Sequence, residues 1–365
     1  MSIIFIAILA VFQILFIFLS FVIYKVFFAA FGIGGPMLFV FLMALSFVFL
    51  LAFILASQYK NRFVRYFHFF SVCWSAFIMP LFCGCVAFFL IEDIALIFGW
   101  KIVPAVAGGF SFGGATLLYA YGIGKARVTA ITRLSVKIPN LPEWWRGKKI
   151  VFISDMHLGD EYGVHFSAKI ARKVSSLAPQ AVFIGGDFFD GVKCDPDALL
   201  VPFRKLHAPH GIYFVSGNHE YTGDSELFFA AIRHAGITIL KNTKQNIEGI
   251  NFFGVDFEDT NERDDFEKVL AGMNLDPAKT NVLIKHVPDN LDIAERAGVS
   301  CELSGHTHHG QIFPLSYLIR TIFEGYDYGL KQFGKMVIYI SSGAGATALP
   351  FRIGTKSEIV LIEFE

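Results

Sequence analysis

The chain has 365 residues, 54% of them hydrophobic, and a formal net charge of zero. Its five cysteines provide no disulfide framework and suit a reducing compartment. The absence of a strong basic excess argues against a nucleic-acid partner, which would usually present a basic patch or stripe.

Composition divides the chain near residue 124. Residues 1–124 carry five Lys or Arg and two acidic side chains, and residues 125–365 carry the remaining 26 basic and 29 acidic ones. We therefore expect a membrane module at 1–124, a juxtamembrane connector at 125–148, and one large α/β domain at 149–365.

The membrane module contains four apolar stretches of spanning length, at 2–24, 36–57, 67–91 and about 94–123. The first lacks the basic start and the short apolar region of a cleavable signal peptide. The last contains Trp100 and Lys101, which can mark an interface, and four glycines whose spacing is typical of close helix packing: Gly108, Gly109, Gly113 and Gly114. We predict an all-α module of about four transmembrane helices.

Basic residues in the short loops predict the orientation. Lys60, Arg62 and Arg65 follow the second stretch, whereas Glu92 and Asp93 follow the third. Lys125, Arg127, Arg133 and Lys137 follow the fourth. The N-terminus and the soluble domain are therefore expected on the cytoplasmic side of a plasma or inner membrane.

The connector carries Trp144 and Trp145 beside Arg146, Lys148 and Lys149. Aromatic rings beside cations suit the lipid headgroup layer. Packing of both rings on the domain's own surface is the alternative.

The soluble domain begins with apolar runs at 150–153, 181–184 and 212–215, each followed by a polar loop. Amphipathic helices are expected at 165–177 and 195–207. This alternation is typical of βαβ units, in which the loops after the strands build the site. Later runs at 237–240, 250–255, 282–284, 337–340 and 359–362 lack long helices between them and indicate a second, mixed or antiparallel sheet.

Residues that bind metals or transfer protons stand at or just beyond four of these runs and after the short segment 301–303: Asp155, His157, Asp187, Asn218, His219, His286, His306 and His308. Singly, Asp187 could cap a helix, Asn218 could serve a turn, and His286 could be a hydrogen-bonded core residue. Because all five loops directly follow such a run or segment, we favour one shared site over five unrelated roles. Its oxygens and imidazoles are too many for one tetrahedral ion, and they suit two divalent ions that share a carboxylate. Mn²⁺, Fe and Zn²⁺ all fit this ligand set.

The motifs D-x-H, G-G-D, G-N-H-E, a lone His before V-P-D, and G-H-T-H resemble those of the calcineurin-like metallophosphoesterase superfamily over about residues 149–365. The chain looks like its membrane-attached branch, described as transmembrane protein with metallophosphoesterase domain. The resemblance implies a four-layer α/β/β/α sandwich. It assigns Asp155, His157 and His308 to one metal, Asn218, His286 and His306 to the other, and Asp187 to both. It also implies that His219 donates a proton to the leaving group or stabilises charge.

Two further residues are candidates for substrate binding. His309 stands where this branch commonly has a glycine, and Arg320 lies within the apolar segment 312–323. We expect this segment to form an apolar rim that dips into the bilayer or holds acyl chains, with Arg320 on a phosphate. Ordinary packing against the second sheet is the alternative.

The sequence thus predicts a membrane-bound hydrolase of a phosphodiester or pyrophosphate bond, with membrane lipids as partners. The resemblance suggests a lipid-linked substrate of the UDP-2,3-diacylglucosamine type used in lipid A synthesis. A general phosphodiesterase or phosphatase is one alternative, and a non-catalytic membrane sensor is another. A sensor would be expected to lack metal ligands, yet all seven are present.

Overall fold

A computed structural model describes the chain except residues 1–2, 60, 191–193 and 348. The chain folds into two compact units, Met1–Gly124 and Lys125–Glu365.

The first unit is helical and consists of α1 (Ile3–Phe31), α2 (Pro36–Ser46), α3 (Val48–Gln58), α4 (Arg62–Ile97) and α5 (Pro104–Ala126), whose last residues belong to the second unit. Among the described residues, α1 and α4 are long and apolar enough to cross a membrane, and the bent α2–α3 pair could form a third span. These two or three candidate spans do not confirm the predicted count of about four.

Buried side chains on α1 recur every three or four residues, at Leu19, Ile23, Val26 and Ala30, as expected for one packed helix face. The predicted role of the α5 glycines is correct at only one position. A Cβ on Gly108 would lie 2.5 Å from Ala30 Cβ, whereas Gly109, Gly113 and Gly114 have nothing within 4 Å.

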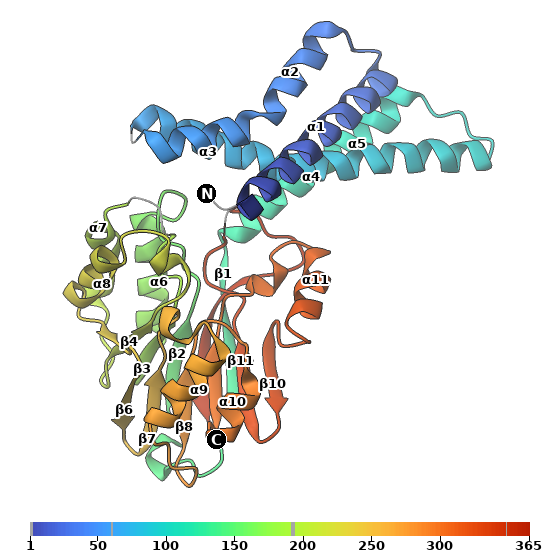
Figure 1. The fold of residues 1–365 in the computed structure, drawn as a ribbon. Helices are drawn as coiled ribbons and strands as arrows, with labels where there is room; N and C mark the ends of the chain where they lie inside the picture. The colour runs from blue at the N-terminus through green and yellow to red at the C-terminus, as the bar shows by residue number, and fades with distance from the viewer. Residues whose placement is uncertain (1–2, 60, 191–193, 348) are drawn as a thin grey trace. The chain divides into compact units, whose positions relative to one another are not determined.

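The second unit contains two six-stranded mixed sheets (Figure 1). The first sheet has the order β1-β12-β2-β3-β4-β5. Its strands are β1 (Thr129–Val136), β2 (Lys149–Ile153), β3 (Ala181–Gly185), β4 (Ile212–Val215), β5 (Thr238–Ile239) and β12 (Ser357–Phe364). Strands β2 to β5 are mutually parallel, and β12 runs antiparallel to β2.

The second sheet has the order β10-β11-β9-β8-β7-β6. Its strands are β6 (Thr243–Ile247), β7 (Ile250–Gly254), β8 (Asn281–Ile284), β9 (Cys301–Ser304), β10 (Gly329–Phe333) and β11 (Met336–Ile340). The four central strands are parallel, and the edge strands β6 and β10 are antiparallel to their neighbours. The predicted second, mixed sheet is therefore confirmed.

Three hydrophobic cores separate the layers of this unit. One lies between the first sheet and the helices α6 (Val164–Ser176), α7 (Pro196–Leu200) and α8 (Ser225–His234). Another lies between the two sheets, and the third lies between the second sheet and the helices α9 (Arg263–Gly272) and α10 (Leu291–Arg296). The layers therefore follow the order α/β/β/α. The helix expected at 195–207 stops at Leu200 and resumes as a short 3₁₀ turn, η2 (Phe203–Lys205), after Pro202.

The segment 125–148 differs from the predicted connector because it contains β1, which pairs in parallel with β12. The alternating burial of β1 is the period expected of a half-exposed strand. Trp145 is fully buried, and its Nε1 donates a hydrogen bond to the Ile247 carbonyl at 3.0 Å. Of the two alternatives for the tryptophan pair, packing within the domain is correct for Trp145.

Candidate metal centre

The predicted ligands all lie at the carboxyl ends of five parallel strands, three in the first sheet and two in the second. Asp155 and His157 follow β2, Asp187 follows β3, and Asn218 follows β4. His286 follows β8, and the turn with His306 and His308 follows β9. Backbone hydrogen bonds tie the loops together, since Asp155 N donates to Gly186 O at 3.0 Å and His157 N to Asp187 O at 3.0 Å.

Asp155, His157 and His308 form one buried group that could hold a metal ion. Nε2 of His157 lies 3.0 Å from Nε2 of His308. Nε2 of His308 lies 3.6 Å from Oδ1 of Asp155. Two imidazole nitrogens and a carboxylate oxygen this close together, all on buried side chains, are typical of a cation site.

Asp187, His286 and His306 form a second group of the same kind. Oδ2 of Asp187 lies 3.2 Å from Nε2 of His286, which lies 3.3 Å from Nδ1 of His306. The same Oδ2 is 3.8 Å from Nε2 of His157 in the first group. Asp187 is therefore placed where a carboxylate shared between two ions would have to be.

Asn218 provides an independent test of whether these residues fit metal ions. Its Oδ1 is buried and accepts no hydrogen bond from any described residue. A buried amide oxygen without a partner is costly, and a divalent cation would satisfy it. The donor set as a whole, carboxylate and amide oxygens with imidazole nitrogens, therefore fits two ions.

Two glycines keep the backbone close to these ligands. A Cβ on Gly217 would lie 2.3 Å from Oδ1 of Asp187, and one on Gly305 would lie 2.3 Å from Oδ2 of Asp155. Any side chain at either position would collide with a ligand oxygen.

Several ligands have left-handed backbone conformations, with φ of 52° at Asp155, 48° at Asp187, 68° at His306 and 48° at His308. Such conformations cost on the order of 1–3 kcal/mol each for residues other than glycine. They persist here because the surrounding hydrogen bonds over-determine the turns. Strain of this kind concentrates at functional sites.

Burial and neighbouring charges shift the pKa values of Asp187 and His286 in opposite directions. Burial works to raise the pKa of Asp187, but the adjacent His286 imidazole holds that pKa below its usual range. Burial works to lower the pKa of His286, but Asp187 outweighs it and raises this pKa to about 10. Burial and the neighbouring His286 lower the pKa of His306 to about 3, so that this ring is neutral, as a metal ligand must be.

Glu220 is a site residue to which the sequence pattern assigned no role, although it ends the G-N-H-E motif. Its buried carboxylate accepts hydrogen bonds from four backbone N–H groups, those of Asp187 (3.0 Å), Phe188 (2.8 Å), Phe189 (3.1 Å) and Gly217 (2.7 Å). Burial, together with the nearby Asp187, raises the pKa of Glu220 to about 7. Glu220 therefore fixes the loop after β3 against the loop after β4.

Asp190 is a second such residue, and the repeated aspartate in G-G-D-F-F-D was its only sequence signal. Oδ1 of Asp190 lies 3.2 Å from Nδ1 of His157. The Asp190 carbonyl oxygen lies 3.2 Å from Nδ1 of His219. Contacts of this kind set the tautomer and orientation of a ligating or proton-transferring imidazole.

Arg352 is a third site residue that the sequence analysis missed, and no sequence signal pointed to it. This fully buried arginine donates to the carbonyl oxygens of His308 (3.2 Å), Ser342 (2.6 Å) and Gly345 (2.8 Å). Burial lowers the pKa of Arg352 to about 10, so it still carries its charge at neutral pH.

His219 lies beside the two groups and forms a third group of candidate ligands with His157 and Asp187. Its backbone N–H donates to Oδ1 of Asp187 at 2.9 Å, and its ring stands perpendicular to that of His157 at 4.6 Å between centroids. Its side chain is partly exposed, unlike that of His157. His219 is thus available to a bound molecule while it touches the ligand set.

His309 and Arg320 line one cavity of about 330 Å³ beside the ligand turn. The His309 ring stacks on Tyr328, with centroids 4.4 Å apart and planes 11° apart. Neither residue belongs to the metal-binding groups found among the described residues.

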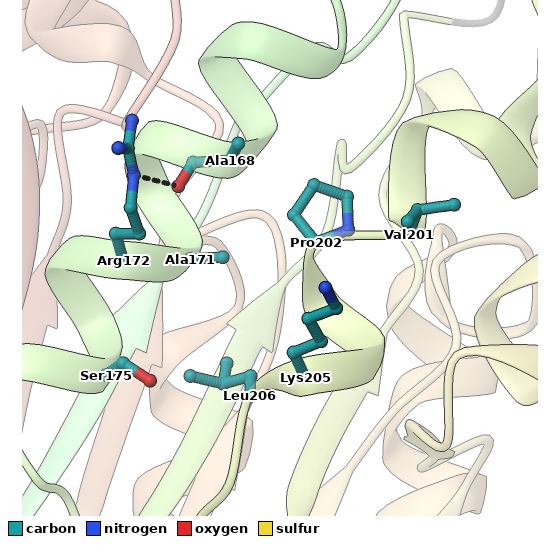
Figure 2. A pocket seen from close by; sticks show the side chains of 8 residues that line it. All are labelled: Ala168, Ala171, Arg172, Ser175, Val201, Pro202, Lys205 and Leu206. Atoms are coloured by element: carbon teal, nitrogen blue, oxygen red, sulfur yellow. Dashed lines mark hydrogen bonds between the residues drawn. The ribbon is translucent and has the colours of Figure 1, made fainter.

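Another cavity, of about 360 Å³, lies on the outer helical layer between α6 and the α7–η2 segment (Figure 2). It is lined by Ala168, Ala171, Arg172, Ser175, Val201, Pro202, Lys205 and Leu206. None of the predicted site residues is among them, so this cavity is separate from the strand-end site.

The two-sheet fold and the strand-end ligands define a metallophosphoesterase. Residues 148–310 match the calcineurin-like phosphoesterase family. An uncharacterized metallophosphoesterase of Helicobacter pylori is 35% identical over 218 residues, which cover 59% of each chain. The Bos taurus transmembrane protein with metallophosphoesterase domain is 32% identical over 67% of this chain and 59% of its own length. The chain therefore belongs to the calcineurin-like metallophosphoesterase family, and it spans about three-fifths of the length of these relatives. Among solved structures, a dimetal phosphatase from Danio rerio aligns with a TM-score of 0.38 and 10% identity, over 54% of this chain and 88% of that one.

Proposed function

We propose that the chain is a membrane-bound hydrolase that cleaves a phosphodiester or pyrophosphate bond with the help of two divalent metal ions. The observation that carries the proposal is the position of Asp187 between the two donor groups, because its Oδ2 lies 3.2 Å from Nε2 of His286 and 3.8 Å from Nε2 of His157. The unpartnered Oδ1 of Asn218 supports it. A shared carboxylate between two ions is the arrangement that phosphoryl-transfer hydrolases use.

In this proposal Asp155, His157 and His308 hold one ion, and Asn218, His286 and His306 hold the other. When bound, such a pair supplies Lewis acidity to the phosphate and lowers the pKa of water. Asp187 would belong to both ion sites. Glu220 and Asp190 hold the Asp187 loop and the His157 ring in place through the contacts given above.

His219 is the residue proposed to donate a proton to the leaving oxygen. Its Nδ1 faces the Asp190 carbonyl at 3.2 Å, so that nitrogen donates and Nε2 remains for the substrate. The side chain of Asp190 lies 3.6 Å from the same Nδ1 and helps to orient the ring.

The test uses the whole chain in detergent, because a soluble fragment without residues 129–136 would lack β1, an edge strand of the first sheet. The purified protein is supplied with Mn²⁺, Fe²⁺ or Zn²⁺ and assayed with bis-p-nitrophenyl phosphate. We expect turnover and two bound ions per chain in the wild type. In Asp187→Asn we expect loss of turnover and of metal binding. Full activity in Asp187→Asn would contradict the shared-carboxylate arrangement. Two bound ions with no turnover under any metal would favour the non-catalytic sensor.

Membrane location and substrate class are also part of the proposal. The apolar helices α1 and α4 and the name of the Bos taurus relative support membrane attachment. With α5 as a further span, as the sequence predicts, the basic residues near Lys60 and Lys125 lie on the same side of the membrane and favour a catalytic domain on the cytoplasmic side. A hydrolase in this position would meet lipid-linked phosphoesters at the bilayer surface. The narrower UDP-2,3-diacylglucosamine assignment gains no support from the relatives reported above, whose names specify no substrate.

A further inference from the structure

We propose that helix α11 (Leu315–Ile322) is a membrane-docking element. Its apolar side chains would insert into a lipid bilayer, and Arg320 and Lys331 beside it would bind lipid phosphate groups. The docking does not depend on which bond the enzyme cleaves, so it can be tested apart from the proposed function.

The first observation is that no residue of α11 is buried. Five large apolar side chains in and just before the helix are between 46% and 63% exposed: Phe313, Leu315, Tyr317, Leu318 and Ile322. Leu315, Leu318 and Ile322 recur at helical spacing, as on one face of an interfacial amphipathic helix. The alternative from the sequence, ordinary packing against the second sheet, is therefore wrong for these side chains.

The second observation is that α11 rests directly on the metal-ligand turn. Gly310 has φ of 67°, and a Cβ there would lie 2.5 Å from Cα of Ser316, so that only glycine permits this approach. At the other end of the helix, the Phe323 ring lies 6.1 Å from the ring of His306. Both ends of α11 are thus held against the loop that carries His306 and His308, and whatever α11 binds is brought beside the metal centre.

The third observation is a cationic cavity beside the apolar side chains. Arg320 and Lys331 line it together with a single carboxylate, Asp327, which lies 3.7 Å from Nε2 of His309. Neither Arg320 nor Lys331 forms an ion pair with a described residue. Apolar side chains next to unpaired cations match the layering of a bilayer, in which phosphate groups lie directly above the acyl chains.

The occupant is inferred from where the chain enters the domain. Ser357 Oγ donates to the Ala126 carbonyl at 3.4 Å, and Thr129 Oγ1 donates to the Ala344 carbonyl at 3.4 Å. Ala344 N in turn donates to the carbonyl of Ser154, the residue before Asp155. The segment that arrives from the apolar helices is therefore fastened at the same edge of the sheets as the ligand loops and α11. Because the chain runs from this edge into the apolar helices, a bilayer is the occupant that we propose for α11.

The experiment measures lipid contact without relying on catalysis. Full-length Leu318→Trp is reconstituted in phosphatidylglycerol nanodiscs with and without brominated acyl chains, and the wild-type emission from the native tryptophans is subtracted. We expect bromination to quench the added emission by about twofold, as for a side chain at the acyl boundary. The matched control is Lys279→Trp, an exposed position before β8 at the opposite edge of the sheet, which should show no quenching.

Two further variants separate the parts of the proposal. Ile322→Glu in the Leu318→Trp background should abolish the quenching while the thermal unfolding midpoint stays unchanged, because Ile322 is exposed. Replacing phosphatidylglycerol by phosphatidylcholine should weaken quenching, and Arg320→Gln with Lys331→Gln should remove this dependence on lipid charge. Absence of quenching of Leu318→Trp would overturn the proposal. If the same residue were also shielded from aqueous acrylamide, a protein surface would be its occupant instead.

Discussion

Nη1 of Arg352 donates a hydrogen bond to the carbonyl oxygen of His308 at 3.2 Å, although the two residues are 44 positions apart in the chain. The same guanidinium bonds the carbonyls of Ser342 and Gly345, which belong to the loop after β11. A buried arginine thus fastens one predicted metal ligand to a loop that packs behind Asp155.

Replacing Arg352 by Met should therefore destabilise the domain and weaken metal binding together. The carbonyl oxygens of His308, Ser342 and Gly345 would each lose one donor, which we expect to cost about 3–5 kcal/mol in total. The measurements are the thermal unfolding midpoint and the metal content of the purified chain. Arg352→Lys, which retains the charge and part of the hydrogen bonding, should lie between Met and the wild type. Unchanged metal content in Arg352→Met would mean that the His308 turn does not depend on this contact.

Glu220 should behave as a positioning residue. Glu220→Ala leaves four buried N–H groups without an acceptor and should lower the free energy of unfolding by about 2–4 kcal/mol. Glu220→Gln keeps one carbonyl oxygen and should lose less. Chemical unfolding of the two variants side by side checks the order. Equal stability of the Ala variant and the wild type would refute the role assigned to the carboxylate.

His219→Ala should impair chemistry without emptying the metal centre. If His219 protonates the leaving oxygen, kcat should fall by roughly 10²–10⁴-fold for an ester with an alkyl leaving group. The loss should be much smaller for a p-nitrophenyl ester, whose leaving group needs no proton. Metal analysis supplies the control, because two ions should remain bound. An equal loss on both esters would argue for charge stabilisation instead.

Glu302 should make stability depend on pH in a recognisable direction. It is fully buried in β9, its Oε1 accepts from Ser304 Oγ at 2.9 Å, and burial raises its pKa to about 7. Because the folded state holds this proton more tightly than the unfolded state, stability should fall as pH rises from about 4.5 to 7, by up to about 3 kcal/mol. Glu302→Gln should lack this part of the pH dependence.

The check is the unfolding midpoint of Glu302→Gln and wild type between pH 5 and 8. The variant's advantage should grow through this range and level off above pH 7. Glu226→Gln, at an exposed helical position, is the matched control and should follow the wild type. Parallel curves for Glu302→Gln and wild type would contradict a raised pKa at Glu302.

Much of the catalytic domain could be predicted from local patterns. Short apolar runs that end in a polar loop became β2, β3 and β4, and the helix expected at 165–177 formed at Val164–Ser176. The three strands that local patterns missed, β1, β6 and β10, are polar or half-exposed and lie at sheet edges, where burial leaves only a weak signal.

The sequence by itself determined which residue types stand at the ends of the central strands, because strand periodicity and the residues that follow each run are local properties. It thus supplied Asp155, Asp187 and His308 as partners in one site. Only the tertiary structure decided what supports them. Glu220 reaches back to the β3 loop, Arg352 reaches the β9 turn, and β12 lies between β1 and β2. These contacts join segments far apart in the chain through burial and hydrogen-bond geometry, for which no local pattern exists.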